Sequence, residues 1–406
     1  MGTAVRIIDA SEHAAWMEQL GLGFFQHQPE GASDYELAVS GHARSRGAFD
    51  GDNVVGTLRS FTTELTAPGP TPVVASALTA VTVAPTHRRR GLLTEMITGD
   101  LRDSADRGEF VSVLLASEYP IYGRFGYGAA TESAKYEIST TGLRFLEPSE
   151  GSVEFVDLSA LRRLAPPVFE EFRTAQPGSI GRRDEWWDRA LRQVEVPGAE
   201  PRKGFQSVYR SPGGDVEGYL LYTGKLEMGE FPPKGTLTVD ELVAVTSRAY
   251  QALWEFCIQV DLQTTTMAPN RSTDEVLPLL VDDGRKVRLV ARTDFLWVRV
   301  LDTAAALSAR RYGREGRIVL RVRDDLLAAG GTYALDGSPT GASCTITGEP
   351  PDLTLPVSAL GATYLGGVAW SRLKDAGLVE EHRQGAAALA DAMFVTPRAP
   401  LCTTYF

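Results

Sequence analysis

The sequence predicts an α+β protein of two or three domains, and three observations carry this prediction. The chain has 406 residues, which is more than one hydrophobic core usually organises. The stretch from Leu78 to Ile97 has the pattern of a strand, a basic turn and an amphipathic helix. Residues 241–254 repeat the strand and the helix without the turn, which indicates either a second copy of the same unit or a coincidence between two ordinary strands.

The first 60 residues contain signals for strands and a helix. Val5 to Ile8 has a strand-like composition, and an amphipathic helix is expected over residues 10–20. A hairpin is expected over residues 48–58, because Asp50-Gly51 is a favoured two-residue turn between strands. This order predicts antiparallel strands that lead into the strand, turn and helix of residues 78–97.

The basic turn after the strand of residues 78–84 is the main candidate site. Pro85 cannot donate to a sheet ladder, so we expect the strand to end there. From Gly91 onward apolar residues recur at helical spacing, so a helix begins in the turn. The first N–H groups of a helix lack partners and lie at the positive end of its dipole, which favours phosphate. The Arg88–Arg90 run adds positive charge to this anion site.

The arginine run has two other interpretations. It could be a solvated cluster that caps a surface helix, or it could be a patch that binds nucleic acid. The formal net charge of -11 argues against nonspecific nucleic-acid binding and suits a cationic partner, although such a charge also serves solubility.

A second motif follows a buried strand. The run from Phe110 to Ala116 is apolar except for Ser112, as expected of a strand covered on both faces, and Tyr122 and then Phe125-Gly-Tyr-Gly128 come after it. Together with the turn Arg88-Arg-Arg-Gly91-Leu-Leu93, this motif resembles the GCN5-related N-acetyltransferase (GNAT) superfamily. Over the whole chain the sequence is similar to the Enhanced intracellular survival (Eis) family of bacterial acetyltransferases. One departure is Leu93, where the wider superfamily has Gly or Ala.

The resemblance implies an enzyme that uses acetyl-CoA and no metal. The N–H groups of the basic turn would bind the pyrophosphate, and the strand edge would pair with the pantetheine amides. Tyr122 would protonate the departing thiolate as a general acid. The cofactor-binding residues implied in this way are Val81, Val83, Arg88, Arg89, Arg90, Gly91, Leu92 and Ser117.

The resemblance also implies an acceptor site and a base. Phe24 and Phe25 lie in the early region that forms the acceptor side of the GNAT cleft, although two phenylalanines are also typical of a core. In Eis-like enzymes the α-carboxylate of the last residue is the base, and here that residue is Phe406; a frayed, solvated end is the other interpretation. The preceding residue is acidic in the family and helps to hold the cationic substrate. Tyr405 stands there in this chain, which puts broad aminoglycoside acceptance in doubt.

Three domains are expected from the resemblance. Residues 1–145 would form the catalytic GNAT domain, and residues 146–293 a degenerate GNAT-like domain that binds no cofactor because it lacks the basic turn. Residues 294–406 would form a sterol-carrier-like domain, with its C-terminus in the active site. The predicted fold is therefore a tandem of GNAT folds, the second one degenerate, followed by this C-terminal domain.

Two function classes remain open at this point. The first is an acetyl-CoA-dependent N-acetyltransferase that acts by direct transfer on amines of a cationic small molecule, such as an aminoglycoside or a polyamine. The alternative is a noncatalytic carrier or assembly module built on the sterol-carrier-like domain. The intact basic turn and Tyr122 favour the enzyme.

Composition limits the location and the partners. The three cysteines match no metal-binding spacing, so we expect a reducing compartment and no disulfide framework. No stretch approaches the apolar length of a membrane span, so we expect a cytoplasmic protein with neither membrane nor nucleic-acid partners. A homo-oligomer is expected, and the family resemblance implies a hexamer.

Overall fold

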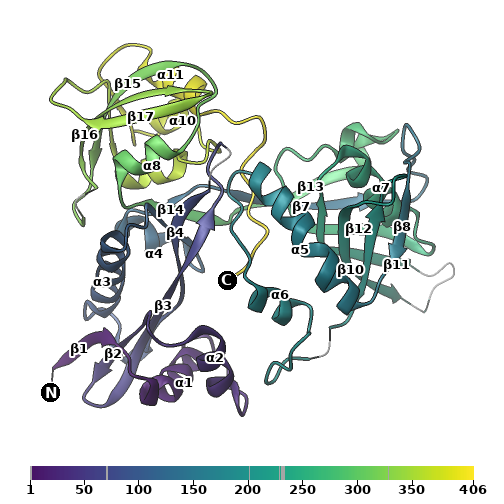
Figure 1. Ribbon diagram of the computed structural model, residues 1–406, viewed down its shortest axis with the longest axis horizontal. Coiled ribbons are helices and arrows are strands. Elements are labelled where there is room, and N and C mark those ends of the chain that lie inside the picture. The colour runs from purple at the N-terminus through teal and green to yellow at the C-terminus, as the bar shows by residue number, and fades with distance from the viewer. Residues whose placement is uncertain (1, 70–71, 201, 228, 230–233, 328) are drawn as a thin grey trace.

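The protein folds into three lobes, each built on one β-sheet (Figure 1). This computed structural model describes residues 2–69, 72–200, 202–227, 229, 234–327 and 329–406. Within these ranges no helix is long and apolar enough to cross a membrane. Short 3-10 turns lie at Ala10–Glu12, Pro85–His87, Gly123–Phe125, Leu277–Leu279 and Gly284–Lys286.

The first sheet carries helices on both faces. In sheet order its strands are β1 (Thr3–Ile7), β2 (Ser45–Asp50), β3 (Asn53–Leu65), β4 (Val73–Val83), β5 (Val111–Leu115), β14 (Leu296–Val300) and β6 (Gly128–Ala129). Its helices are α1 (His13–Gly23), α2 (Ala32–Ser40), α3 (Leu92–Asp106) and α4 (Tyr119–Tyr122). Neighbours in β2 point to opposite faces, so Ala48 packs with α3 and Phe49 packs with α1. The strand, turn and helix predicted for residues 78–97 are confirmed, and so is the hairpin of residues 48–58, although its two-residue turn is Gly51-Asp52 and not Asp50-Gly51.

The second sheet repeats the layout of the first. In sheet order its strands are β13 (Val287–Asp294), β7 (Glu132–Ser139), β12 (Gln263–Arg271), β11 (Lys234–Ala244), β10 (Val216–Glu227), β9 (Phe205–Arg210) and β8 (Ser152–Phe155). Its helices are α5 (Leu158–Ala175), α6 (Asp184–Ala190) and α7 (Ser247–Gln259). In both sheets one parallel pair is joined by a crossover helix, α3 between β4 and β5 and α7 between β11 and β12. Tyr219 packs with α5 and Leu220 packs with α7, so both faces are covered.

The third sheet shares its hydrophobic core with the first. Its strands are β17 (Gly341–Ile346), β16 (Gly331–Ser338), β15 (Gly316–Arg323), β18 (Leu353–Pro356) and β19 (Glu380–Glu381). Its helices are α8 (Thr303–Ala309), α9 (Val357–Thr363), α10 (Trp370–Asp375) and α11 (Ala386–Phe394). One cluster contains Val113 and Val298 of the first sheet together with Leu320 and Leu360 of the third domain. The contact is so close that a Cβ on Gly361 would lie 2.1 Å from the Val298 carbonyl oxygen.

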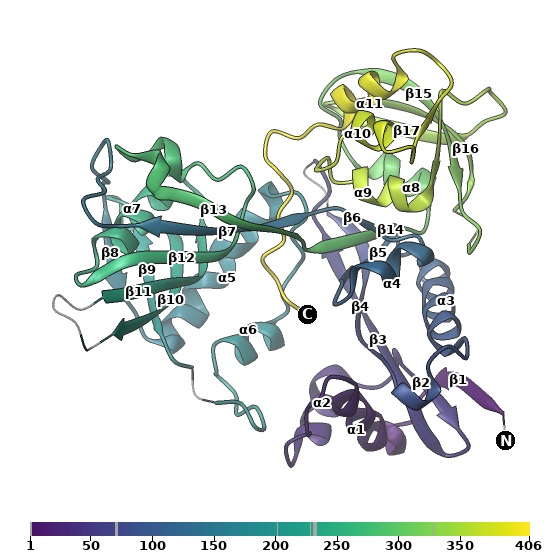
Figure 2. The ribbon, with the colours of Figure 1, turned by 180° about the vertical axis from the view of Figure 1, so that it is seen from behind.

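Two strands cross the predicted domain boundaries. β7 lies within the predicted first domain of residues 1–145 but pairs with β12 and β13 of the second sheet. β14 lies within the predicted third domain of residues 294–406 but pairs with β5 of the first sheet. An unpaired edge of the apolar strand β5 would be available for pairing with a further strand. β14 pairs with this edge, from Leu296 opposite Leu115 to Val300 opposite Val111. Figure 2 shows β7 and β14 at the junction between the lobes.

Candidate active site

The strands β4 and β5 separate part of the way along the first sheet. They pair in parallel from Ala75 with Val111 to Leu78 with Leu114. Beyond Leu78, β4 continues to Val83 and is paired with β3 only. A bulge lies just beyond the last pair, where the left-handed backbone of Ala80 has a φ of 55°. In the described part of the chain no strand therefore lies on the β5 side of the β4 edge that carries Val81 and Val83.

The basic turn closes the wide end of this opening. Gly91 is the N-cap of α3 with a φ of 84°, and Arg89 is also left-handed with a φ of 63°. No backbone hydrogen bond recorded for the described residues uses the N–H groups of Arg89, Arg90 or Gly91. A Cβ on Gly91 would meet no atom within 4 Å, so the requirement for glycine comes from its backbone conformation. Unpaired N–H groups at the positive end of a helix form an anion site.

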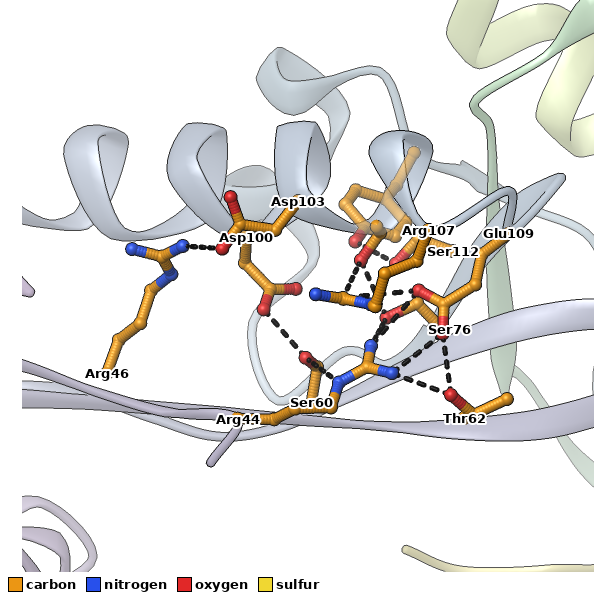
Figure 3. Close-up of polar contacts among 12 residues, drawn as sticks. Arg44, Arg46, Ser60, Thr62, Ser76, Asp100, Asp103, Arg107, Glu109 and Ser112 are labelled. Atoms are coloured by element: carbon orange, nitrogen blue, oxygen red, sulfur yellow. Dashed lines mark hydrogen bonds and ion pairs between the residues drawn. The ribbon is translucent and has the colours of Figure 1, made fainter. Parts of the chain in front are cut away.

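A buried polar cluster holds α3 against the sheet (Figure 3). Arg44 pairs with Glu109 at 2.7 Å, and the Ser60 hydroxyl donates to Asp100 of α3 at 2.7 Å. Burial raises the pKa of Asp100, and the hydrogen bond from Ser60 acts in the opposite direction. The cluster fixes the helix whose N-terminus forms the turn.

The opening and the turn enclose a cavity of about 600 Å³. It brings together ten of the residues predicted from the sequence, which are Phe24, Phe25, Val81, Val83, Arg88, Arg89, Gly91, Leu92, Ser117 and Tyr122. Arg90 does not line it, and its guanidinium donates to the Thr86 carbonyl at 3.1 Å. His87, Glu118 and Arg124 also line the cavity but were not predicted as site residues.

Tyr122 lies at the end of α4, just after β5, and only 5% of it is exposed. Burial raises the pKa of Tyr122 to about 12, with a smaller contribution from the negative charge of Glu118. A hydrogen bond with Ser117 acts in the opposite direction. The hydroxyl therefore keeps its proton near neutral pH and is able to donate it.

Phe24 and Phe25 lie at the edge of the same cavity. They follow the last turn of α1, and Phe25 is 94% exposed with a left-handed φ of 58°. A fully exposed ring on a strained backbone contributes little to a core. Their exposure therefore argues against a role of these two residues in the core.

The C-terminus lies beside a second cavity of about 480 Å³, on β3 and β4 next to α6 (Figures 1 and 2). The Phe406 ring meets Phe61 edge-on with 5.8 Å between centroids. Phe61 pairs with Ala77, one residue before β4 and β5 separate at Leu78. Phe406 and Leu115, the last residue of β5, pack against the same hydrophobic cluster. Among the described residues none lines both cavities; on β4 the second cavity is lined by Val74 and the first by Val81 and Val83.

Tyr405 lies outside both cavities. Its ring packs edge-on against Phe295 with 5.0 Å between centroids, and 64% of the residue is exposed. The cavity beside Phe406 is also lined by Arg182, Arg183 and Trp186, which were not predicted from the sequence. Their only sequence signal is a run of paired arginines and tryptophans just before and within α6, and such a run has no local periodicity that points to a site.

In the second sheet a side chain bonds to the strand edge at the corresponding position. β11 and β12 separate after Thr238 pairs with Met267, and α7 begins after Thr246 with no basic turn. The Arg271 guanidinium donates to the Leu242 carbonyl of β11 at 2.8 Å and pairs with Glu275 at 3.0 Å. The Leu242 carbonyl on this edge of β11 therefore has a hydrogen-bond partner within the domain.

Comparison with known proteins agrees with this arrangement. Two models described as acetyltransferase (GNAT) domain match residues 4–130 and 178–322, and a sterol carrier protein domain matches residues 303–403. An uncharacterized N-acetyltransferase of Streptomyces griseus is 40% identical over 100% of both chains. The N-acetyltransferase Eis of Mycobacterium tuberculosis is 34% identical, over 79% of this chain and 78% of that protein.

A solved structure supports the same relationship over the full length. Eis1 from Mycobacterium abscessus is 34% identical, with a TM-score of 0.88 over 99% of this chain and 100% of that chain. The predicted order of two GNAT folds and a sterol-carrier-like domain is confirmed, and the comparisons favour the enzyme over the noncatalytic carrier. The chain belongs to the Eis family of GNAT N-acetyltransferases, for which acetyl-CoA is the acetyl donor.

Proposed function

We propose that this N-acetyltransferase moves the acetyl group directly from acetyl-CoA to an amine of a cationic small molecule, with aminoglycosides and polyamines as the candidate classes. One observation carries the proposal. The anion site at Gly91, the free edge of β4 and the buried Tyr122 line a single cavity between separated strands. A linear thioester with a phosphate-rich end matches that order of groups.

The basic turn and the strand edge are the proposed donor site. The N–H groups near Gly91 would bind the pyrophosphate, helped by Arg88 and Arg89, while Val81 and Val83 would pair with the pantetheine amides. The thioester would then lie where β4 and β5 separate, beyond Val81 toward Leu78. Ser117 and Tyr122 follow β5 on the opposite side of that point.

The reaction needs one proton donor and one proton acceptor. The amine nitrogen forms a bond to the acetyl carbon, the carbon–sulfur bond breaks, and the departing thiolate takes the proton of the Tyr122 hydroxyl. The attacking ammonium must first lose a proton, which we assign to the α-carboxylate of Phe406. The nitrogen loses a second proton after it attacks, and this proton restores the Tyr122 hydroxyl. Of the two protons that the ammonium loses, one therefore replaces the proton that Tyr122 gave to sulfur, and the other leaves to solvent through the Phe406 carboxylate.

The charges near the C-terminus support this assignment. Glu64 and Glu170 both pair with Arg173, and Arg182 pairs with Glu241. Among the ion pairs of the described residues none uses the terminal carboxylate, so no guanidinium takes up its charge. The Phe406 ring packs against Phe61. Partial desolvation of the carboxylate by this apolar surface would make it a better base.

We propose a homo-oligomer, a hexamer by resemblance to the family, and a cytoplasmic location. The domain ranges 1–145, 146–293 and 294–406 are kept as proposals, with β7 and β14 exchanged between sheets as described above.

Replacing Gly91 with Val should weaken acetyl-CoA binding by about 1–3 kcal/mol, the usual range for lost hydrogen bonds of buried groups. The side chain disfavours the left-handed backbone that orients the N–H groups of the turn. Calorimetric titration with acetyl-CoA measures the effect. Gly108→Val is the matched control, because Gly108 is also left-handed and open but follows the other end of α3. Equal affinity of the Gly91 and Gly108 variants would remove this assignment.

Replacing Tyr122 with Phe should lower kcat by about 10²–10⁴-fold while acetyl-CoA affinity is kept, as expected on loss of a general acid. Because the pKa of Tyr122 is about 12, the wild-type rate should show no loss of this acid between about pH 6 and 9. Steady-state kinetics across that range measures both effects. Tyr119→Phe serves as the control, because Tyr119 is exposed and packs on Trp297 outside the cavity. A Tyr122→Phe enzyme as fast as this control would require another donor.

Deleting Phe406 should abolish acetylation while acetyl-CoA still binds, because the base is lost but the donor cavity is unchanged. A short C-terminal tag should have the same effect, since it moves the carboxylate away from Phe61. The same tag at the N-terminus is the control. Full activity of the C-terminally tagged enzyme would contradict the role given to the carboxylate.

A panel of amines should separate the acceptor classes. We expect consumption of acetyl-CoA with polyamines or with a restricted set of aminoglycosides, because Tyr405 gives no negative charge beside the terminal residue. Release of free thiol measures the rate for each amine. Turnover with none of these cations, but with neutral or anionic amines, would contradict the proposed acceptor class.

A further inference from the structure

The segment between α5 and α6 connects the first domain with the C-terminal tail. On one side Gly181 N–H donates to the Glu64 carbonyl at 2.9 Å, and Thr66 N–H donates to the Ser179 carbonyl at 2.8 Å. The segment therefore lies beside the end of β3 and is hydrogen-bonded to it. On the other side Leu401 N–H donates to the Pro177 carbonyl at 2.8 Å. The path of the tail is thereby set relative to β3, the strand that carries Phe61.

Arg182 lies near the end of this segment, and its guanidinium contacts the last residues of the chain. Its Nε donates to Thr404 Oγ1 at 2.9 Å, and its Nη2 contacts the hydroxyl and carbonyl oxygens of Thr403 at 3.3 and 3.4 Å. Only 1% of the side chain is exposed. The guanidinium carbon lies 3.8 Å from the centre of the Phe169 ring and 4.0 Å from that of Trp186.

Glu241 balances the charge of this guanidinium. The two groups form a bidentate pair at 2.6 and 3.2 Å, and the Tyr219 hydroxyl donates to the same carboxylate at 3.0 Å. A buried arginine without this partner would attract the terminal carboxylate two residues beyond Thr404, which would make that carboxylate a weaker base. With Glu241 present, Arg182 holds the tail by its threonines and leaves the carboxylate unpaired.

We propose that Arg182 is the positioning residue for the terminal carboxylate, and that its pair with Glu241 keeps that carboxylate available as a base. The proposal rests on the function proposed above, in which Phe406 supplies the base. Arg182 contacts Thr403 and Thr404 and not the reacting atoms, so its effect on the reaction passes through the tail. Without it, the last residues keep the Trp186 bond to the Tyr405 carbonyl but lose their charged donor.

Three variants test the proposal. Arg182→Gln removes the charge and the fork, Arg182→Lys keeps the charge only, and Thr404→Val removes one acceptor while the Glu241 pair stays intact. The matched control is Arg210→Gln, because Arg210 pairs with Glu154 in the same domain and has no contact with the tail. Circular dichroism and acetyl-CoA titration confirm that each variant is folded.

The first readout is release of Phe406 by carboxypeptidase A, followed by mass spectrometry. We expect release at least about fivefold faster in Arg182→Gln and Thr404→Val than in wild type, because each loses hydrogen bonds that hold the end. Arg182→Lys should be intermediate, since an ammonium cannot bond to Glu241 and Thr404 in the same fork geometry. Arg210→Gln should match wild type.

The second readout is kcat together with the KM for acetyl-CoA. We expect kcat to fall at least about tenfold in Arg182→Gln with an unchanged KM, because misplacement of a reacting group by about 1 Å is enough for such a loss. Phe406 release at the wild-type rate in both Arg182→Gln and Thr404→Val would overturn the positioning role, whatever the activity. Faster release with wild-type kcat would overturn the role of the terminal carboxylate itself, and with it this proposal.

Discussion

The buried ion pair of Arg182 and Glu241 is the interaction on which the arrangement of the three domains around the C-terminus depends. It joins the segment between α5 and α6 to β11, and its hydrogen bonds to Thr403 and Thr404 extend that connection to the tail of the third domain. Desolvation of two charges is costly, and here it is offset by bidentate geometry, by the Tyr219 hydroxyl and by the rings of Phe169 and Trp186. Loss of either charge would leave the other one buried and unpaired, so the pair specifies one docking position for the tail.

The two GNAT folds of the chain differ at the corresponding strand edge. In the first copy the edge of β4 beyond Leu78 is free, and the cavity beside it contains Arg88, Gly91 and Tyr122. In the second copy Arg271 bonds to the matching edge of β11 and packs near Trp254. A free strand edge inside a domain has unpaired polar groups, which a side chain such as Arg271 is able to satisfy. In the second domain residues 176–183 contact the tail of the chain.

The shared core between the first and third domains keeps the tail within reach of the first sheet. β14 leaves the second sheet region, completes the first sheet beside β5 and leads directly into α8 of the third domain. Close contact of Gly361 with the Val298 carbonyl leaves little freedom for the third domain to move relative to that sheet. From α11 the chain needs only the residues after Phe394 to reach Phe61, where the ring of Phe406 packs.

The sequence by itself was enough to predict the basic turn and to bring Tyr122, Phe24 and Phe25 near it, and only the tertiary structure decided what surrounds the C-terminus. A strand, a turn with Arg88 and Gly91, and the following helix form from contacts between near neighbours, so their pattern is visible in a short window. Tyr122 could be placed because it follows the buried strand β5 within a few residues. The sheet membership of β7 and β14 depends on which strand edges are left open by distant segments, and no local pattern records that choice. For the same reason Arg182 could not be found in advance, and the packing of the Tyr405 ring on Phe295 could not be predicted. Their surroundings are assembled from residues more than two hundred positions apart in the chain, brought together by the docking of one domain on another.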